Sequence, residues 1–84
     1  MSAAGGAVPT VVYVANADSH DIAVLALDAG AAGVTLREID RFATAGSVMP
    51  LAVRPDKRVL YASIRSDPFR VLSLAIDPAS GRLE

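Results

Sequence analysis

The sequence has no cysteine, and it holds a single histidine among its 84 residues. The lack of cysteine excludes disulfides and thiolate metal sites. Neither charge dominates, since eight Lys and Arg stand against nine Asp and Glu. No basic field therefore predicts binding to nucleic acid or to an anionic membrane surface. The longest apolar run, residues 22–27, is far shorter than the roughly 20 residues of a membrane-spanning helix.

The first ten residues are rich in glycine and alanine. They lack the positive start and the sustained apolar stretch of a signal peptide. We expect residues 1–10 to be a flexible segment ahead of a domain at residues 11–84. Without a signal peptide, a membrane helix or cysteines, the chain is expected to be soluble and cytoplasmic.

The chain is apolar for its length, with 52% hydrophobic and 20% charged residues. This composition argues against disorder. A small domain has little interior in which to bury so much apolar surface. The excess predicts either a fragment of a larger fold or a chain that associates strongly.

Short β-branched and apolar segments alternate with turn residues along the whole chain. Polar and Gly- or Pro-containing stretches, such as residues 16–21, 54–58 and 77–81, separate them. Run 22–27 is too short for a typical helix and predicts a strand covered on both faces. Strands are expected at residues 11–15, 22–27, 36–42, 50–53, 59–64 and 69–76, with Leu83 opening one more.

Residues 36–42 allow two interpretations. Interleaved charges suit an exposed outer strand, where charge discourages pairing between sheet edges. Leu36, Ile39 and Phe42 also lie at helical spacing, so a helix is the alternative.

The sequence repeats with a period near 48 residues. Residues 12–15 (VYVA) match residues 60–63 (LYAS), and residues 22–28 match residues 71–77 one position further on. A repeat of 40–50 residues built from short strands is typical of β-propellers. We predict an all-β fold: a β-propeller fragment of about two blades of antiparallel four-stranded meander, with blade parts at 11–43 and 50–84. By the repeat, the chain begins on a second strand and stops as a fourth strand begins.

Several motifs share the spacing of one family. They are PDKRVLY at residues 55–61, Arg65, FRVL at residues 69–72, and Ile76, Pro78, Gly81 and Leu83, together with residues 12–15 and 46–50. In these motifs the chain resembles the opening blades of the propeller-type 6-phosphogluconolactonases, a family of seven-bladed cytoplasmic lactonases.

The resemblance implies hydrolysis of 6-phosphogluconolactone, a phosphorylated sugar lactone, to 6-phosphogluconate in the pentose phosphate route, with no organic cofactor. It implies this activity for a full-length propeller, and the 84 residues alone are expected to be inactive and to self-associate. The alternative is a non-catalytic propeller that binds or scaffolds a partner, since a fold does not fix a function.

Lactone hydrolysis needs a base for water, a donor for the oxyanion, and a cation for a substrate phosphate. One propeller rim would gather residues 16–21, 44–49 and 65–68. On it, Arg65 and His20 are the candidate substrate-binding residues. Arg65 could instead be a turn residue paired with Asp67, and His20 a solvated turn residue.

The remaining polar positions favour structural roles. The turn with Arg54, Asp56, Lys57 and Arg58 lies at the other rim and is expected to be solvated. Tyr13 and Tyr61 are repeat-equivalent and are expected in the core, and Asp28 and Asp77 are expected to cap turns. No metal ligand set is present, and the sequence assigns no catalytic residue.

Overall fold

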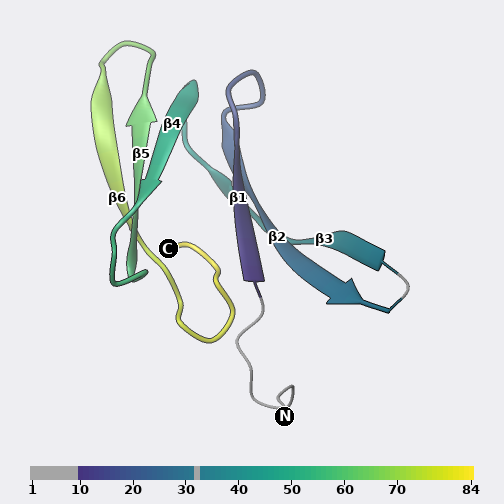
Figure 1. Cartoon of the computed structure of the whole chain (residues 1–84). Coiled ribbons are helices and arrows are strands. Elements are labelled where there is room, and N and C mark those ends of the chain that lie inside the picture. The colour runs from purple at the N-terminus through teal and green to yellow at the C-terminus, as the bar shows by residue number, and fades with distance from the viewer. Residues whose placement is uncertain (1–9, 32) are drawn as a thin grey trace.

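The computed structural model describes residues 10–31 and 33–84, which form strands, turns and loops without any helix. It follows that no described segment is a helix able to cross a membrane. The strands make two three-stranded antiparallel sheets, ordered β1-β2-β3 and β4-β5-β6 (Figure 1). Their bounds are β1 Thr10–Asn16, β2 Asp21–Gly30, β3 Gly33–Ala43, β4 Val48–Val53, β5 Val59–Ile64 and β6 Arg70–Ala75. The all-β prediction is confirmed, and each sheet is a meander of consecutive strands.

Strand β2 is the central strand of the first sheet and is covered on both faces near its start. Ile22, Ala23 and Val24 are consecutive and all buried, although consecutive side chains of a strand point to opposite faces. The side of Ile22 and Val24 belongs to the core between the two sheets. Ala23 lies on the other side, opposite Arg41 of β3. The uninterrupted apolar run was therefore correctly interpreted as a doubly covered strand.

The helical alternative for residues 36–42 is wrong, because this segment lies within β3. Strand β3 pairs with β2 over its whole length, from Asp21 opposite Ala43 to Gly30 opposite Gly33. The register shifts between Val24 and Leu25, which leaves Ile39 as an extra residue on β3. Such a bulge allows both Ile39 and Phe42, three residues apart, to pack against the core. The bulge explains a spacing that resembles a helix.

Several predicted bounds shift by a few residues. Strand β4 begins at Val48, and β2 continues past Asp28, which therefore does not cap a turn. Residues 1–9 of the predicted flexible segment lie outside the described residues, whereas Thr10 is the first residue of β1. At the other end, Leu83 forms a bridge with Ile76, and the backbones of Ala75 and Glu84 exchange hydrogen bonds of 3.0 and 3.1 Å. Leu83, where the repeat predicts one more strand, thus forms an isolated β-bridge that continues the pairing beyond β6.

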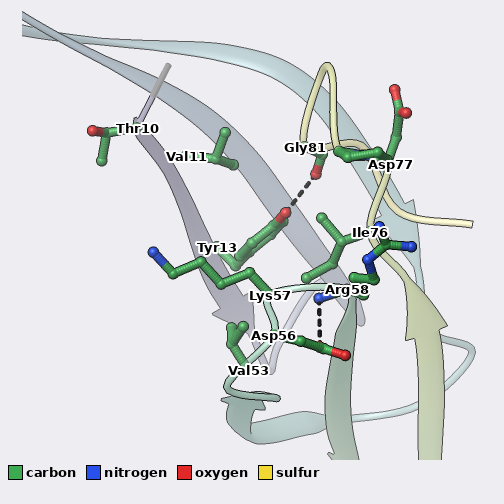
Figure 2. A pocket seen from close by; sticks show the side chains of 11 residues that line it. Thr10, Val11, Tyr13, Val53, Asp56, Lys57, Arg58, Ile76, Asp77 and Gly81 are labelled. Atoms are coloured by element: carbon green, nitrogen blue, oxygen red, sulfur yellow. Dashed lines mark hydrogen bonds between the residues drawn. The ribbon is translucent and has the colours of Figure 1, made fainter. Parts of the chain in front are cut away.

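The core lies between the facing surfaces of the two sheets. Its buried members are Ile22, Val24, Val48, Leu60, Ala62, Ile64, Leu74 and Leu83, so both sheets contribute. A polar contact joins the sheets: the Tyr13 hydroxyl donates to the Gly81 carbonyl oxygen at 2.6 Å, drawn as a dashed line in Figure 2. Burial raises the pKa of Tyr13, so its hydroxyl stays protonated as the donor.

The close approach of the 77–83 loop to β1 requires glycine at position 81. Gly81 has φ of 82°, and a Cβ there would lie 2.6 Å from Val11 Cγ2. We expect Gly81→Ala to lower the free energy of unfolding by about 1–3 kcal/mol, because left-handed strain adds to a clash with a stiff side chain. Urea denaturation in dilute solution measures this loss.

The matched control is Gly30→Ala. A Cβ at Gly30 meets no atom within 4 Å, and its φ is not positive. A change within about 0.5 kcal/mol is expected there. Equal losses for the two substitutions would contradict the close docking of the loop on β1.

Candidate functional site

Three connecting segments meet at the end of the molecule where β1, β3 and β5 finish. They are the turn 17–20, the loop 44–47 and the turn 65–69. The Thr44 amide donates to the His20 carbonyl at 2.9 Å, and the Arg65 amide donates to the Ser47 carbonyl at 2.7 Å. Thr44 is buried, and its hydroxyl donates to the Gly46 carbonyl at 2.8 Å. The loop 44–47 therefore ties the turns of both sheets into one rim, named here the loop rim.

His20 and Arg65 both lie on the loop rim and are exposed. His20 has φ of 58°, a left-handed conformation that the turn imposes. Within residues 10–31 and 33–84, no ion pair joins Arg65 to Asp67. The structure brings the two candidates to the same end of the molecule, through backbone hydrogen bonds, and records no contact between their side chains.

A groove of about 380 Å³ opens beside the turn that carries His20. Asn16, Asp18 and Ser19 supply its polar wall, and Met49 of β4 its apolar wall. Met49 is 47% exposed. The groove thus lies between a polar turn of the first sheet and the first strand of the second.

A network of polar side chains around Asp21 connects the turn 17–20 of the loop rim to strands β1, β2 and β3. The Asp21 side chain is only 12% exposed and pairs with Arg41 at 3.2 Å. Its carboxylate also accepts hydrogen bonds from Asn16 Nδ2 at 2.9 Å and Ser19 Oγ at 3.0 Å. Arg41 in turn binds Glu38 through two hydrogen bonds, at 2.7 and 3.1 Å. The network fixes the turn 17–20 on the underlying strands.

Within this network, the pKa shifts of Asp21, Glu38 and Arg41 all favour the ionised form of each side chain. The hydrogen bond from Asn16, with those from Arg41 and Ser19, lowers the pKa of Asp21. The Arg41 guanidinium likewise lowers the pKa of Glu38. Glu38 and then Asp21 raise the pKa of Arg41. None of these groups is poised as a base at neutral pH, so the network positions the rim rather than transferring protons.

Sequence reasoning did not identify this network. Asp21 was assigned only to a turn and Arg41 only to an exposed strand. Asp21 begins β2, and Arg41 lies near the end of β3. These two strands pair antiparallel, with Asp21 opposite Ala43 and Ala23 opposite Arg41. Knowledge of the register was needed to bring the two charges together.

The larger groove, about 750 Å³, lies at the opposite end of the molecule between the two sheets (Figure 2). Tyr13 and Val11 of β1 form one wall, and the turn 54–58 and the loop after β6 form the other. Its acids are engaged in turns: Asp77 accepts from the Ser80 amide, as predicted for a capping residue, and Asp56 accepts from the Arg58 amide. This groove is distant from both candidate residues.

The turn 54–58 is solvated, as the sequence predicts. Arg54 and Asp56 form two hydrogen bonds, at 3.0 and 2.7 Å, on an exposed surface. Lys57 has φ of 62°, which the turn requires. Among the residues that the structure describes, no group of three or more His, Asp or Glu side chains could hold a metal ion.

Comparison with known proteins adds the decisive observation, although no protein-family model matches the chain. A 6-phosphogluconolactonase of Pectobacterium carotovorum is 43% identical over 67 residues, which are 80% of this chain and 19% of the relative. The chain is homologous to a part of the 6-phosphogluconolactonases. The same figures hold for the 6-phosphogluconolactonase of Pectobacterium atrosepticum. That of an Enterobacter species is 38% identical over 72 residues, 86% of this chain and 20% of the relative.

This chain spans about a fifth of the length of the curated 6-phosphogluconolactonases it matches. The predicted resemblance is thereby confirmed. The match covers about four-fifths of the chain, so it includes residues of both sheets.

The Asp21 network predicts a pH-dependent stability. A carboxylate whose folded pKa is depressed contributes stability above its unfolded pKa, about 3.9, and loses it as pH falls through the folded value. We expect Asp21→Asn to destabilise the chain at pH 7 and to flatten the fall in stability below about pH 4. Urea unfolding across pH measures this.

A direct measurement is the NMR titration of the Asp21 carboxyl carbon. In the unmodified chain it is expected to titrate below 3.9, the ordinary value. Asn16→Ala removes the hydrogen bond that contributes most to the lowering and is expected to raise the midpoint. A midpoint at or above the ordinary value in the unmodified chain would show that the network does not hold Asp21 ionised.

Proposed function

We propose that this chain forms two adjoining blades of a 6-phosphogluconolactonase β-propeller, which hydrolyses 6-phosphogluconolactone to 6-phosphogluconate. The observation that carries the proposal is the 43% identity to a 6-phosphogluconolactonase over 80% of the chain. Closure of a propeller ring and the hydrolysis itself are parts of this proposal.

The architecture of the chain supports the assignment to blades. Each sheet is an antiparallel meander, and the sheets pack face to face through one apolar core. By the repeat, β1 corresponds to β5 and β2 to β6, so β4 has no equivalent before β1 among the described residues. Leu83, which bridges to Ile76, corresponds in turn to the start of β3. A propeller blade has four strands, and this phase is what two neighbouring, partly complete blades present.

The reaction defines what a lactonase site must supply. Water attacks the lactone carbonyl carbon, the oxyanion forms, and the ring C–O bond then breaks to give a carboxylate and a hydroxyl. A base takes the proton of water, donors stabilise the oxyanion, and a cation binds the phosphate. The described residues of this chain offer a cation and an imidazole on one rim, which are two of these parts at most.

Arg65 is the residue we assign to the anionic end of the substrate. Its guanidinium is exposed on the loop rim, while its backbone is fixed by the hydrogen bond to Ser47. A fixed backbone with an exposed planar guanidinium suits bidentate binding of a phosphate or carboxylate. His20 lies on the same rim and is assigned a substrate contact. The base and the oxyanion donors are assigned to the remaining blades.

The test is a chimaera in which this chain replaces its matching segment in the Pectobacterium carotovorum 6-phosphogluconolactonase. We expect the chimaera to hydrolyse 6-phosphogluconolactone well above the spontaneous rate. The isolated 84-residue chain is expected to show no such rate, because most of the site is absent from it. A folded chimaera without lactonase activity would favour a non-catalytic binding propeller.

Within the chimaera, Arg65→Met tests the substrate contact. A hydrogen bond to a charged group is worth about 1.5–3 kcal/mol, so kcat/KM is expected to fall roughly 10- to 150-fold, mainly through KM. Arg58→Met is the matched control, since Arg58 is also exposed but lies on the opposite rim. Equal losses for the two variants would remove Arg65 from the site.

A further inference from the structure

The backbone of Ser47 is bound at both its polar groups by the turn that carries Arg65. This turn, residues 65–69, joins β5 to β6 at the upper end of Figure 1. The Arg65 amide donates to the Ser47 carbonyl at 2.7 Å, and the Ser47 amide donates to the Ser66 hydroxyl oxygen at 3.2 Å. Two neighbouring residues of the turn thus bind one residue of the loop 44–47. These two contacts are named here the Ser47 hydrogen-bond pair.

The residue before Ser47 brings the loop into direct contact with Ser66. Gly46 is buried, and a Cβ there would lie 2.6 Å from Ser66 Oγ and 2.8 Å from Ile64 Cγ2. Such distances are essentially never seen for a Cβ atom, so any other residue at position 46 would displace the Ser66 hydroxyl or the loop. The hydroxyl is therefore packed against the loop as well as hydrogen-bonded to it.

The far end of the turn is held separately. Ile64 and Arg70 are the last residues that pair between β5 and β6, and the turn lies directly beyond them. Arg70 Nη1 donates to the Pro68 carbonyl at 2.7 Å. Loss of the Ser66 contact would therefore release the Arg65 end of the turn and leave the other end in place.

The Arg65 side chain depends on this backbone for its position. It is exposed, and within residues 10–31 and 33–84 no ion pair or hydrogen bond holds its guanidinium. A long side chain of this kind keeps its rotamer freedom, which it loses when it binds a ligand. Contacts that fix the Arg65 backbone therefore decide where the guanidinium meets a ligand on the loop rim.

We propose that Ser66 is a positioning residue for Arg65 in lactone hydrolysis, an inference that rests on the proposed function. Its hydroxyl holds the Arg65 end of the turn on the loop 44–47, so the guanidinium extends from a fixed backbone when it binds the phosphate of the lactone. Less conformational freedom is then lost on binding, and the contribution is to substrate affinity. Because Ser66 acts through Arg65, it has no effect on affinity once the guanidinium is removed.

Hydrogen exchange of the 84-residue chain, followed by NMR, tests the contact itself. Ser66→Ala removes the acceptor of the Ser47 amide, so exchange of that amide is expected to become roughly tenfold faster or more. The Thr44 amide, which donates to the His20 carbonyl, is expected to keep its rate. Ser63→Ala is the matched control, because Ser63 is also half-buried and its hydroxyl makes no hydrogen bond to another described residue. It is expected to change neither rate.

A double-mutant cycle in the chimaera tests the link to the substrate. Ser66→Ala is expected to raise KM for 6-phosphogluconolactone roughly 2- to 12-fold, the value of one neutral hydrogen bond, and to leave kcat within about twofold. In the Arg65→Met chimaera, Ser66→Ala is expected to leave KM unchanged. Ser66→Cys, whose sulfur is a weak acceptor, replaces Ser66→Ala if that variant loses its strand signal in circular dichroism.

Two results would overturn the positioning role. One is an unchanged exchange rate of the Ser47 amide in Ser66→Ala. The other is an equal rise in KM with and without the Arg65 guanidinium, which would give Ser66 a structural role alone. Both leave an active unmodified chimaera, and so the proposed function, intact. An inactive but folded chimaera would instead overturn the proposed function, and with it any part of Ser66 in hydrolysis.

Discussion

The packing of one sheet on the other is the constraint on which the rest of this structure depends. A three-stranded meander buries little on its own, and the large buried apolar side chains here belong to the cluster between the two sheets. Ile22 and Val24 are fully buried in a cluster that also contains Leu60 and Ala62 of the other sheet. The docking of the 77–83 loop on β1 depends on the same contact, because it brings Gly81 against Val11.

The loop rim is a consequence of this packing. The β1–β2 turn and the β5–β6 turn belong to different sheets and reach the same end only because the sheets are stacked. Thr44 and Ser47 then connect them through backbone hydrogen bonds. The side chains of His20 and Arg65 are left exposed on a hydrogen-bonded backbone frame. Exposed side chains on a positioned loop are typical of binding sites.

The sequence predicts most of the strands and the repeat, because hydrophobic runs and turn residues are local signals. It could not decide residues 36–42, since the β3 bulge gives Ile39 and Phe42 a helix-like spacing and depends on the partner strand. Tyr61, which is 36% exposed, was misplaced in the core because the repeat predicts equivalent positions but not which faces are covered. The Asp21–Arg41 pair was missed since only the strand register brings these charges together.

The Tyr13–Gly81 contact has a consequence for the order of folding. Its partners are 68 residues apart, so the first sheet cannot complete its packing until Gly81 has been synthesised. At ~5–20 residues per second, the ribosome takes roughly 3–14 s to make that stretch, whereas a hairpin forms in ~1–10 μs. The nascent β1–β2 hairpin therefore waits about a million times longer than it needs to form before the hydrogen bond from Tyr13 to Gly81 can be made.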